Sequence, residues 1–338
     1  MVVVPPINRV NARAVALAVA LSAVSGVAAC AGPEQTAVTS TTTPPPLIER
    51  ANTTTVAPPP LPPPGSCPGW AVMAQPAVGA SALIEASGLA GGRRNPGVWW
   101  AHNDSGDSPR VFALEGDGRL LTTVTVSGAT AWDWEDIDIG PGPGGLPTIY
   151  VADVGDNPKA RHGTLGYQLY RFWEPDLGRT VRSAMTLSAQ RIDVVYSDSR
   201  SHNVEATLLD PVTGDYFIIT KEVTSEIFRI PAAALVPGTT VIAQKVGELS
   251  LDDPATDHDR PVAADISADG SMIVVKTMEL TWFWSRTRGQ TVAQALTGTP
   301  CPPQALGSGE AIAFNASGGQ VATLAEGHGR PLFRYRRT

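Results

Sequence analysis

Acidic side chains gather at the two ends of one stretch of the chain, residues 131–157. Before a Pro/Gly-rich turn the residues alternate between apolar and acidic, and after it an apolar run ends in carboxylates. This pattern predicts a two-stranded antiparallel hairpin. The start of its first strand and the end of its second lie side by side, so the acids at both ends should converge. These acids are Asp133, Glu135, Asp136, Asp153 and Asp156.

Carboxylates that meet at one place repel each other unless a cation lies among them. Oxygen ligands without sulfur or imidazole suit Ca²⁺. We therefore predict that these acids bind a divalent cation, with Ca²⁺ as the cofactor. The alternative is a structural role, because Asp is a common turn former and Glu often pairs with arginine.

The hairpin belongs to one of five similar segments, each with a first strand, a turn, a second strand, a loop and a third strand. Counted between the second positions of the first strands, the steps are 48, 70, 59 and 46 residues. These positions are Gly88, Asp136, Ala206, Asp265 and Ala311. Four short strands in a repeat of about 50 residues are typical of propeller blades, and no helical period interrupts them. The sequence predicts an all-β fold, a β-propeller of five four-stranded blades, or of six if the longest step contains a degenerate blade.

The fifth repeat ends after its third strand, at the last residues of the sequence. The segment Trp70–Ile84 is free to supply a fourth strand, which would close the propeller without an exposed edge. This closure would bring Cys67 and Cys301 into one blade. A disulfide between them is then expected in an exported protein, and two unrelated thiols are the alternative.

In a propeller, the first strand of each blade begins and the second ends on the same rim. Acids occupy these positions in several repeats, and lysines stand beside them. The predicted ligand-binding residues of the rim are Asp104, Glu205, Lys221, Lys276 and Glu310. Mixed charges suit an anionic ligand such as a phosphoester, although the lysines can equally be ion-pair partners of the acids.

The strand starts Glu135-Asp-Ile and Glu310-Ala-Ile, with hydrophobic strands that end in Asp or Glu, resemble those of bacterial propellers of the phytase and esterase-like phytase group. The resemblance covers Ala86 to Thr338 and implies a calcium-dependent phosphoesterase. A binding module of the cell envelope competes with this interpretation. We favour the binding module because the rim shows no nucleophile–base pair, and we assign no catalytic residue; the phosphoester hydrolase is the alternative.

Residues 1–29 have the features of a secretory signal peptide, with arginines before an Ala/Val-rich apolar run. The run ends in Val27-Ala-Ala-Cys30, which resembles the bacterial lipobox. We therefore predict an exported protein that is anchored to the cell membrane by lipid on Cys30 and faces the extracytoplasmic side. An ordinary signal peptide with an incidental cysteine is the alternative.

Residues 30–66 form a Thr- and Pro-rich linker that cannot bury a core and should be disordered, and the propeller domain spans residues 67–338. A net charge of −7 over 338 residues, without a basic patch, argues against nucleic acid as a partner. We expect a monomer that binds an unidentified ligand or envelope partner.

Overall fold

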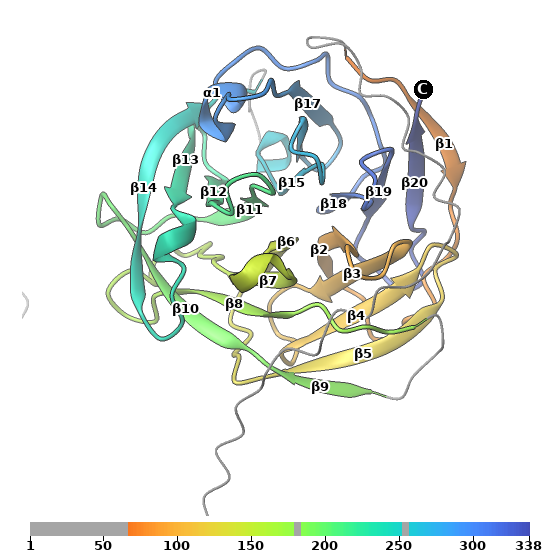
Figure 1. The fold of residues 1–338 in the computed structure, drawn as a ribbon, viewed down its shortest axis with the longest axis horizontal. Helices are drawn as coiled ribbons and strands as arrows, with labels where there is room; N and C mark the ends of the chain where they lie inside the picture. The colour runs from red at the N-terminus through yellow and green to blue at the C-terminus, as the bar shows by residue number, and fades with distance from the viewer. Residues whose placement is uncertain (1–66, 179–183, 252–256) are drawn as a thin grey trace, which may run out of the picture. The chain divides into compact units, whose positions relative to one another are not determined.

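The computed structural model describes residues 67–178, 184–251 and 257–338, and these are built almost entirely of β-strands (Figure 1). The helical elements among them are α1 (Val292–Leu296) and the 3-10 turns η1 (Pro143–Gly145), η2 (Ala232–Ala234) and η3 (Asp257–Asp259). The predicted all-β class is confirmed. None of the described helices is long and apolar enough to span a membrane. The predicted signal peptide, lipidation site and linker lie outside the described residues.

The first sheet contains five strands in the order β2-β3-β4-β5-β9. They are β2 (Ala86–Gly91), β3 (Val98–Asn103), β4 (Arg110–Glu115), β5 (Leu120–Ser127) and β9 (Met185–Ser188). Strands β2 to β5 pair antiparallel in chain order, as the sequence predicted. Strand β9 was not predicted, and it pairs in parallel with the outer strand β5. Strand β9 lies within the longest step between repeats, from Asp136 to Ala206, and this stretch of chain therefore contributes an edge strand to the first sheet.

The second sheet has eight strands in the order β11-β12-β13-β14-β10-β8-β7-β6. They are β6 (Trp134–Pro141), β7 (Pro147–Asp153), β8 (Tyr167–Trp173), β10 (Gln190–Tyr196), β11 (Val204–Leu209), β12 (Tyr216–Thr220), β13 (Ser225–Ile230) and β14 (Thr240–Leu249). Two antiparallel four-stranded units make up this sheet. They join at their outer strands, where β10 and β14 pair in parallel. The sequence predicted both units but not their junction.

The third sheet has three strands, so the four-stranded blade predicted here is incomplete. The strands are β15 (Ala263–Ile266), β16 (Met272–Lys276) and β17 (Thr281–Ser285). In place of a regular fourth strand, the backbone of Cys301 and Gln304 bonds to the outer edge of β17. The prediction that this region lacks a helix is wrong, because α1 lies between β17 and Cys301. Thr291 and Gln294 start α1 with a capping box, a pattern that the sequence already contained.

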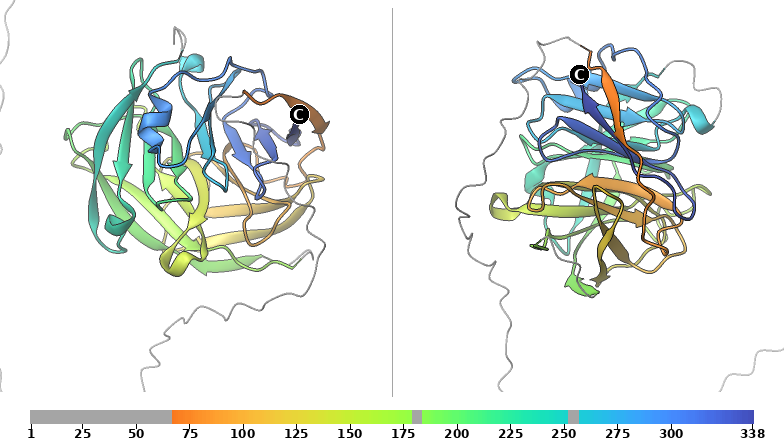
Figure 2. Two further views of the ribbon diagram at one scale, coloured as in Figure 1. Left: turned by 45° about the horizontal axis from the view of Figure 1, so that its top comes forward. Right: turned by 90° about the vertical axis from the view of Figure 1, so that its right-hand side faces the viewer.

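The fourth sheet has the order β1-β20-β19-β18 and contains both ends of the described chain. Its strands are β1 (Trp70–Ala74), β18 (Ala311–Phe314), β19 (Gln320–Leu324) and β20 (Phe333–Arg337). Strand β1 pairs antiparallel with β20 beside the C-terminus (Figure 2), which confirms the predicted N-terminal fourth strand. Cys67 and Cys301 form the predicted disulfide.

The sheets comprise five units, each of which starts with an inner strand: β2, β6, β11, β15 or β18. Each inner strand packs against the next, and β18 packs against β2, so the cycle is closed. Figure 1 shows these strands near the centre, with β1, β5, β9, β10 and β14 at the periphery. Five hydrophobic cores lie between neighbouring units. Successive strand side chains point to opposite faces, so Trp99 and Trp100 of β3 fill two different cores.

Candidate functional site

The predicted hairpin corresponds to β6 and β7, joined by the turn that contains η1. Trp134 pairs with Asp153, and a β-bulge separates Trp134 from Asp136. The acidic start of β6 thus lies beside the end of β7, as predicted. Because successive side chains on a strand point to opposite faces, Glu135 and Asp136 enter different surroundings.

Three carboxylates form what we call the acidic cluster: Asp104 after β3, Asp133 before β6, and Glu135 within β6. One oxygen of each lies within 4.8 Å of the others. Glu135 is only 3% exposed, and no hydrogen bond or ion pair to its carboxylate is present among the described residues. Gly155 closes the cluster from the side of β7, because a Cβ there would collide with Oε1 of Glu135 and Oδ2 of Asp133.

Burial and mutual repulsion raise the pKa values of the acidic cluster. Burial, followed by repulsion from Glu205 and Asp104, raises the pKa of Glu135 well above its usual range. Burial and Asp104 raise the pKa of Asp133 to about 6. Burial also raises the pKa of Asp104, and Glu326 adds repulsion there. A divalent cation would reverse these shifts, because it favours the ionised form of each carboxylate.

Charged residues from other units surround the acidic cluster. Glu205 on β11 forms an ion pair with Lys221, whose Nζ lies 2.6 and 2.7 Å from its two oxygens. Glu310, just before β18, lies with Glu326 and Asp104 in a group whose oxygens are within 4.8 Å of one another. Burial and then Glu205 raise the pKa of Glu310 to about 8. The structure therefore brings together four of the predicted rim residues: Asp104, Glu205, Lys221 and Glu310.

Asp136 does not join the acidic cluster. Its carboxylate accepts hydrogen bonds from the backbone N–H groups of Ile137 at 2.9 Å, Thr207 at 2.9 Å and Ala264 at 3.4 Å. Thr207 belongs to β11 and Ala264 to β15, so Asp136 connects three inner strands. Burial and the nearby Asp138 raise the pKa of Asp136.

Asp153 and Asp156 also have protein partners. Asp153 accepts hydrogen bonds from the backbone just before β6 and pairs with Arg161 at 2.9 Å. Asp156 accepts hydrogen bonds from the Arg161 N–H group and the Tyr167 hydroxyl. Burial acts to raise the pKa of Asp156, but these hydrogen bonds lower it. Of the five predicted metal ligands, two lie in the acidic cluster and three hold neighbouring backbone in place.

Lys276, the remaining predicted rim residue, has a side chain that is fully buried. Its ammonium donates to the carbonyl oxygens of Gly307 at 2.7 Å and Met278 at 3.3 Å. Burial lowers the pKa of Lys276 to about 8. The contacts of Lys276 are thus with the main chain and not with the acids around Glu135.

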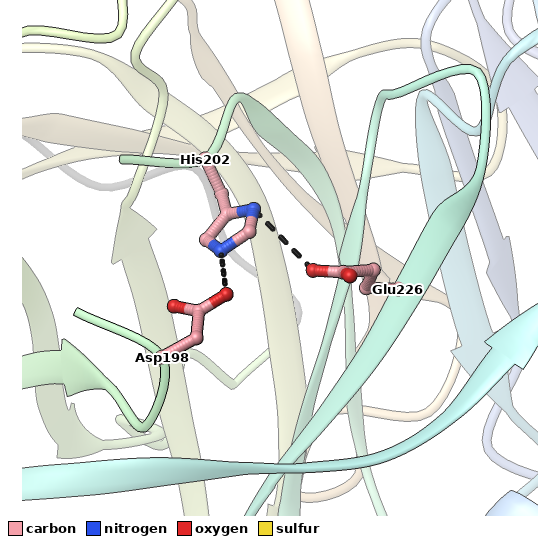
Figure 3. Close-up of side chains that lie close together, drawn as sticks. All are labelled: Asp198, His202 and Glu226. Atoms are coloured by element: carbon pink, nitrogen blue, oxygen red, sulfur yellow. Dashed lines mark hydrogen bonds and ion pairs between the residues drawn. The ribbon is translucent and has the colours of Figure 1, made fainter. Parts of the chain in front are cut away.

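A second cluster, Asp198, His202 and Glu226, was not predicted from the sequence (Figure 3). His202 Nε2 lies 2.9 Å from Asp198 Oδ2, and its Nδ1 lies 3.6 Å from Glu226 Oε2. Burial acts to raise the pKa of Asp198, but hydrogen bonds from Arg200 and His202 lower it to about 2. Asp198 and His202 lie in the loop between β10 and β11, whereas Glu226 lies on β13. The cluster depends on the junction of β10 and β14, which sequence spacing does not reveal.

Comparison with protein-family models and with curated proteins finds no match for this chain. Among solved structures, the hydrazine synthase of Kuenenia stuttgartiensis is similar with a TM-score of 0.42 and 9% identity, over 75% of this chain and 83% of that one. A similarity at this level carries no argument about function. The resemblance to the phytase group stays a prediction.

Proposed function

We propose that this chain is an exported, lipid-anchored β-propeller of five blades that binds Ca²⁺ at the acidic cluster and uses the ion to hold an anionic ligand or envelope partner. The closed cycle of inner strands and the hydrophobic core between each pair of units support the propeller architecture. A sixth blade has no counterpart among the five inner strands of the described residues.

The observation that carries the calcium site is the buried Glu135 carboxylate, which faces Asp104 and Asp133 without a donor of its own. A carboxylate that is removed from water needs a hydrogen-bond donor or a cation in compensation. Ca²⁺ takes six to eight oxygen ligands, which carboxylates, waters and main-chain carbonyls can share. Three converging carboxylates therefore fit a calcium ion better than an ordinary ion pair.

A pocket that includes Lys221, the ion-pair partner of Glu205, supports an anionic ligand. Lys159, Arg260, Asn157 and Asn203 also line it, together with the acid Glu222. A calcium ion with open coordination positions binds oxyanions, and lysine and asparagine donors of this pocket would orient them. A phosphoester is one ligand of this kind, which is why the phosphoesterase remains the alternative function.

Calorimetry on the full chain, stripped of metal and purified in detergent, tests the calcium site. We expect Ca²⁺ to bind wild type and the control Glu248→Gln equally, because Glu248 is an exposed acid that pairs with Lys245. Binding should be lost in Glu135→Gln and weakened in Asp104→Asn. Equal binding heats in all four proteins would contradict the assignment of the site.

Turnover of a generic phosphoester separates the two functions. The binding module predicts no hydrolysis above the buffer rate, with or without Ca²⁺. Calcium-dependent hydrolysis that disappears in Glu135→Gln, but not in Glu248→Gln, would instead establish the phosphoesterase.

The lipid anchor rests on the lipobox-like Val27–Cys30. Protein from a bacterial host should partition into detergent, whereas Cys30→Ala should stay in the aqueous phase. Detergent partitioning that persists in Cys30→Ala would refute the anchor.

A further inference from the structure

His202 occupies a buried aromatic niche away from the acidic cluster. Its side chain is 1% exposed, and its ring centroid lies 4.8 Å from that of Tyr196 and 5.0 Å from that of Phe228. A neutral imidazole has one nitrogen that donates and one that accepts. The partners of the two nitrogens therefore decide what this ring can do.

Asp198 determines which ring nitrogen carries the proton. Its Oδ2 lies 2.9 Å from His202 Nε2 and also accepts a hydrogen bond from Arg200 Nε at 2.8 Å. An ionised carboxylate only accepts hydrogen bonds, so Nε2 donates, and in the neutral ring Nδ1 presents its lone pair. Metal-binding histidines have this arrangement, in which a carboxylate accepts the proton of the nitrogen that does not bind the metal.

The Nδ1 atom of His202 has no hydrogen-bond partner in the part of the chain that the structure describes. It faces two carboxylate oxygens, Glu222 Oε1 at 3.5 Å and Glu226 Oε2 at 3.6 Å. In the neutral ring, the Nδ1 lone pair cannot donate to these oxygens. Two ligands of a tetrahedral metal ion with bonds of about 2.1 Å lie about 3.4 Å apart. Nδ1 thus lies at the spacing of a fellow ligand from each of the two oxygens.

We propose that Nδ1 of His202 and the carboxylates of Glu222 and Glu226 bind a divalent transition-metal ion, for which Zn²⁺ is the probe, and that Asp198 orients the imidazole. One imidazole with two carboxylates suits Zn²⁺, whereas a site of oxygens alone suits Ca²⁺. A water completes the tetrahedron. This site is separate from the acidic cluster and does not depend on the proposed calcium function.

Cationic side chains form ion pairs with the carboxylates of Glu222 and Glu226. Lys159 lies 2.8 Å from Glu222, while Lys245 and Arg200 lie 2.7 and 3.1 Å from Glu226. These cations are 53%, 37% and 60% exposed, respectively. Ion pairs of exposed side chains contribute little, so a bound metal ion can displace them without moving the buried imidazole.

Titration of the metal-stripped full chain with Zn²⁺, in the presence of saturating Ca²⁺, tests the proposal by calorimetry. We expect one zinc ion per chain, with binding abolished in His202→Ala. Asp198→Asn should bind zinc about 10- to 100-fold more weakly, because an orienting carboxylate contributes about that much to metal affinity. Co²⁺ in place of Zn²⁺ should give the visible absorption of a tetrahedral site, which His202→Ala should lack.

Two controls separate this site from other zinc-binding groups. His162→Ala removes a nearby exposed histidine and should leave zinc affinity unchanged, as should Glu135→Gln in the acidic cluster. If His202→Ala does not fold, Glu226→Gln with the cobalt spectrum provides the same test. The absence of zinc binding to wild type would overturn the proposal and identify His202 as a structural clamp between carboxylates. Zinc binding and cobalt absorption that persist in both His202→Ala and Glu226→Gln would overturn it as well.

Discussion

Glu135 and Asp136 are neighbours on β6, and both carboxylates are buried, yet their surroundings are opposite. Asp136 accepts hydrogen bonds from three backbone N–H groups. Glu135 faces Asp104 and Asp133, with no donor among the described residues. Burial alone therefore does not separate a structural carboxylate from a functional one. The partners of each carboxylate do.

The geometry of the inner strands explains why an aspartate is needed at position 136. Inner strands of neighbouring units pack together without forming a common hydrogen-bonded ladder. Their buried N–H groups need acceptors, because an unsatisfied donor destabilises the fold. Asp265 on β15 has the same role as Asp136, since its Oδ2 accepts a hydrogen bond from the Phe314 N–H group on β18 at 2.7 Å. The aspartates thus hold the cycle together, and the glutamate position stays available for binding.

Asp136→Ala should have the largest effect on stability of the substitutions considered, because it removes the structural carboxylate of the pair. It leaves the N–H groups of Ile137 and Thr207 buried without an acceptor, and each such loss costs about 1–3 kcal/mol, so the free energy of unfolding should fall by about 2–6 kcal/mol. Urea unfolding of the full chain measures this change. Asp117→Ala, in the exposed turn before β5, is the control and should change stability by less than about 0.5 kcal/mol. A loss below about 1 kcal/mol for Asp136→Ala would contradict the role of these hydrogen bonds.

The sequence predicted most of the strands because their apolar periodicity and turn residues are local signals. It also predicted that acids would converge at the start of β6. It did not separate Glu135 from Asp136, because the donors that bind Asp136 come from β11 and β15, far along the chain. The parallel junctions of β5 with β9 and of β10 with β14, and with them the His202 cluster, likewise depend on packing between units. Such contacts have no local signal.

The pH dependence of stability tests the acids in and around the acidic cluster. Burial, together with neighbouring acids, raises the pKa of Asp133 to about 6 and that of Glu310 to about 8, and burial raises that of Glu205 to about 7 despite Lys221. At these pH values the folded protein holds protons that the unfolded chain releases. Stability falls with rising pH wherever the folded state binds more protons than the unfolded state. Without Ca²⁺, the melting temperature should therefore decrease from about pH 5 to about pH 8.

Saturating Ca²⁺ should flatten this decrease, because the bound ion keeps its ligands ionised and metal binding releases their protons. Glu310→Gln should flatten the upper part of the window without Ca²⁺, and the control Glu248→Gln should not. A melting temperature that rises with pH in the metal-free protein would contradict the raised pKa values of these acids.

Gly155→Ala should affect the acidic cluster while leaving the hydrogen bonds of Asp136 intact. The added Cβ would collide with the carboxylates of Glu135 and Asp133, which must then move apart. We expect calcium affinity to fall about tenfold, which corresponds to about 1.4 kcal/mol. Calorimetry measures this change. Gly163→Ala is unsuitable as a control, because Gly163 has a positive φ of 70° and an alanine there would strain the backbone. Gly79→Ala is suitable, since its Cβ would have ordinary contacts. Unchanged affinity in Gly155→Ala would place the ion elsewhere.

Glu135→Gln should have the smallest effect on stability and the opposite sign to Asp136→Ala. In the metal-free protein, the neutral amide removes repulsion with Asp104 and Asp133 and can donate to them, so the free energy of unfolding should rise by up to about 1 kcal/mol. The same change removes a calcium ligand, so added Ca²⁺ should no longer stabilise the variant, whereas it should stabilise wild type by about 2.7 kcal/mol at a hundredfold excess over the dissociation constant. Urea unfolding with chelator and with Ca²⁺ measures both terms. A loss of stability in the metal-free variant would mean that Glu135, like its neighbour, has a structural partner. The contrast between the two carboxylates would then not correspond to a division between binding and structure.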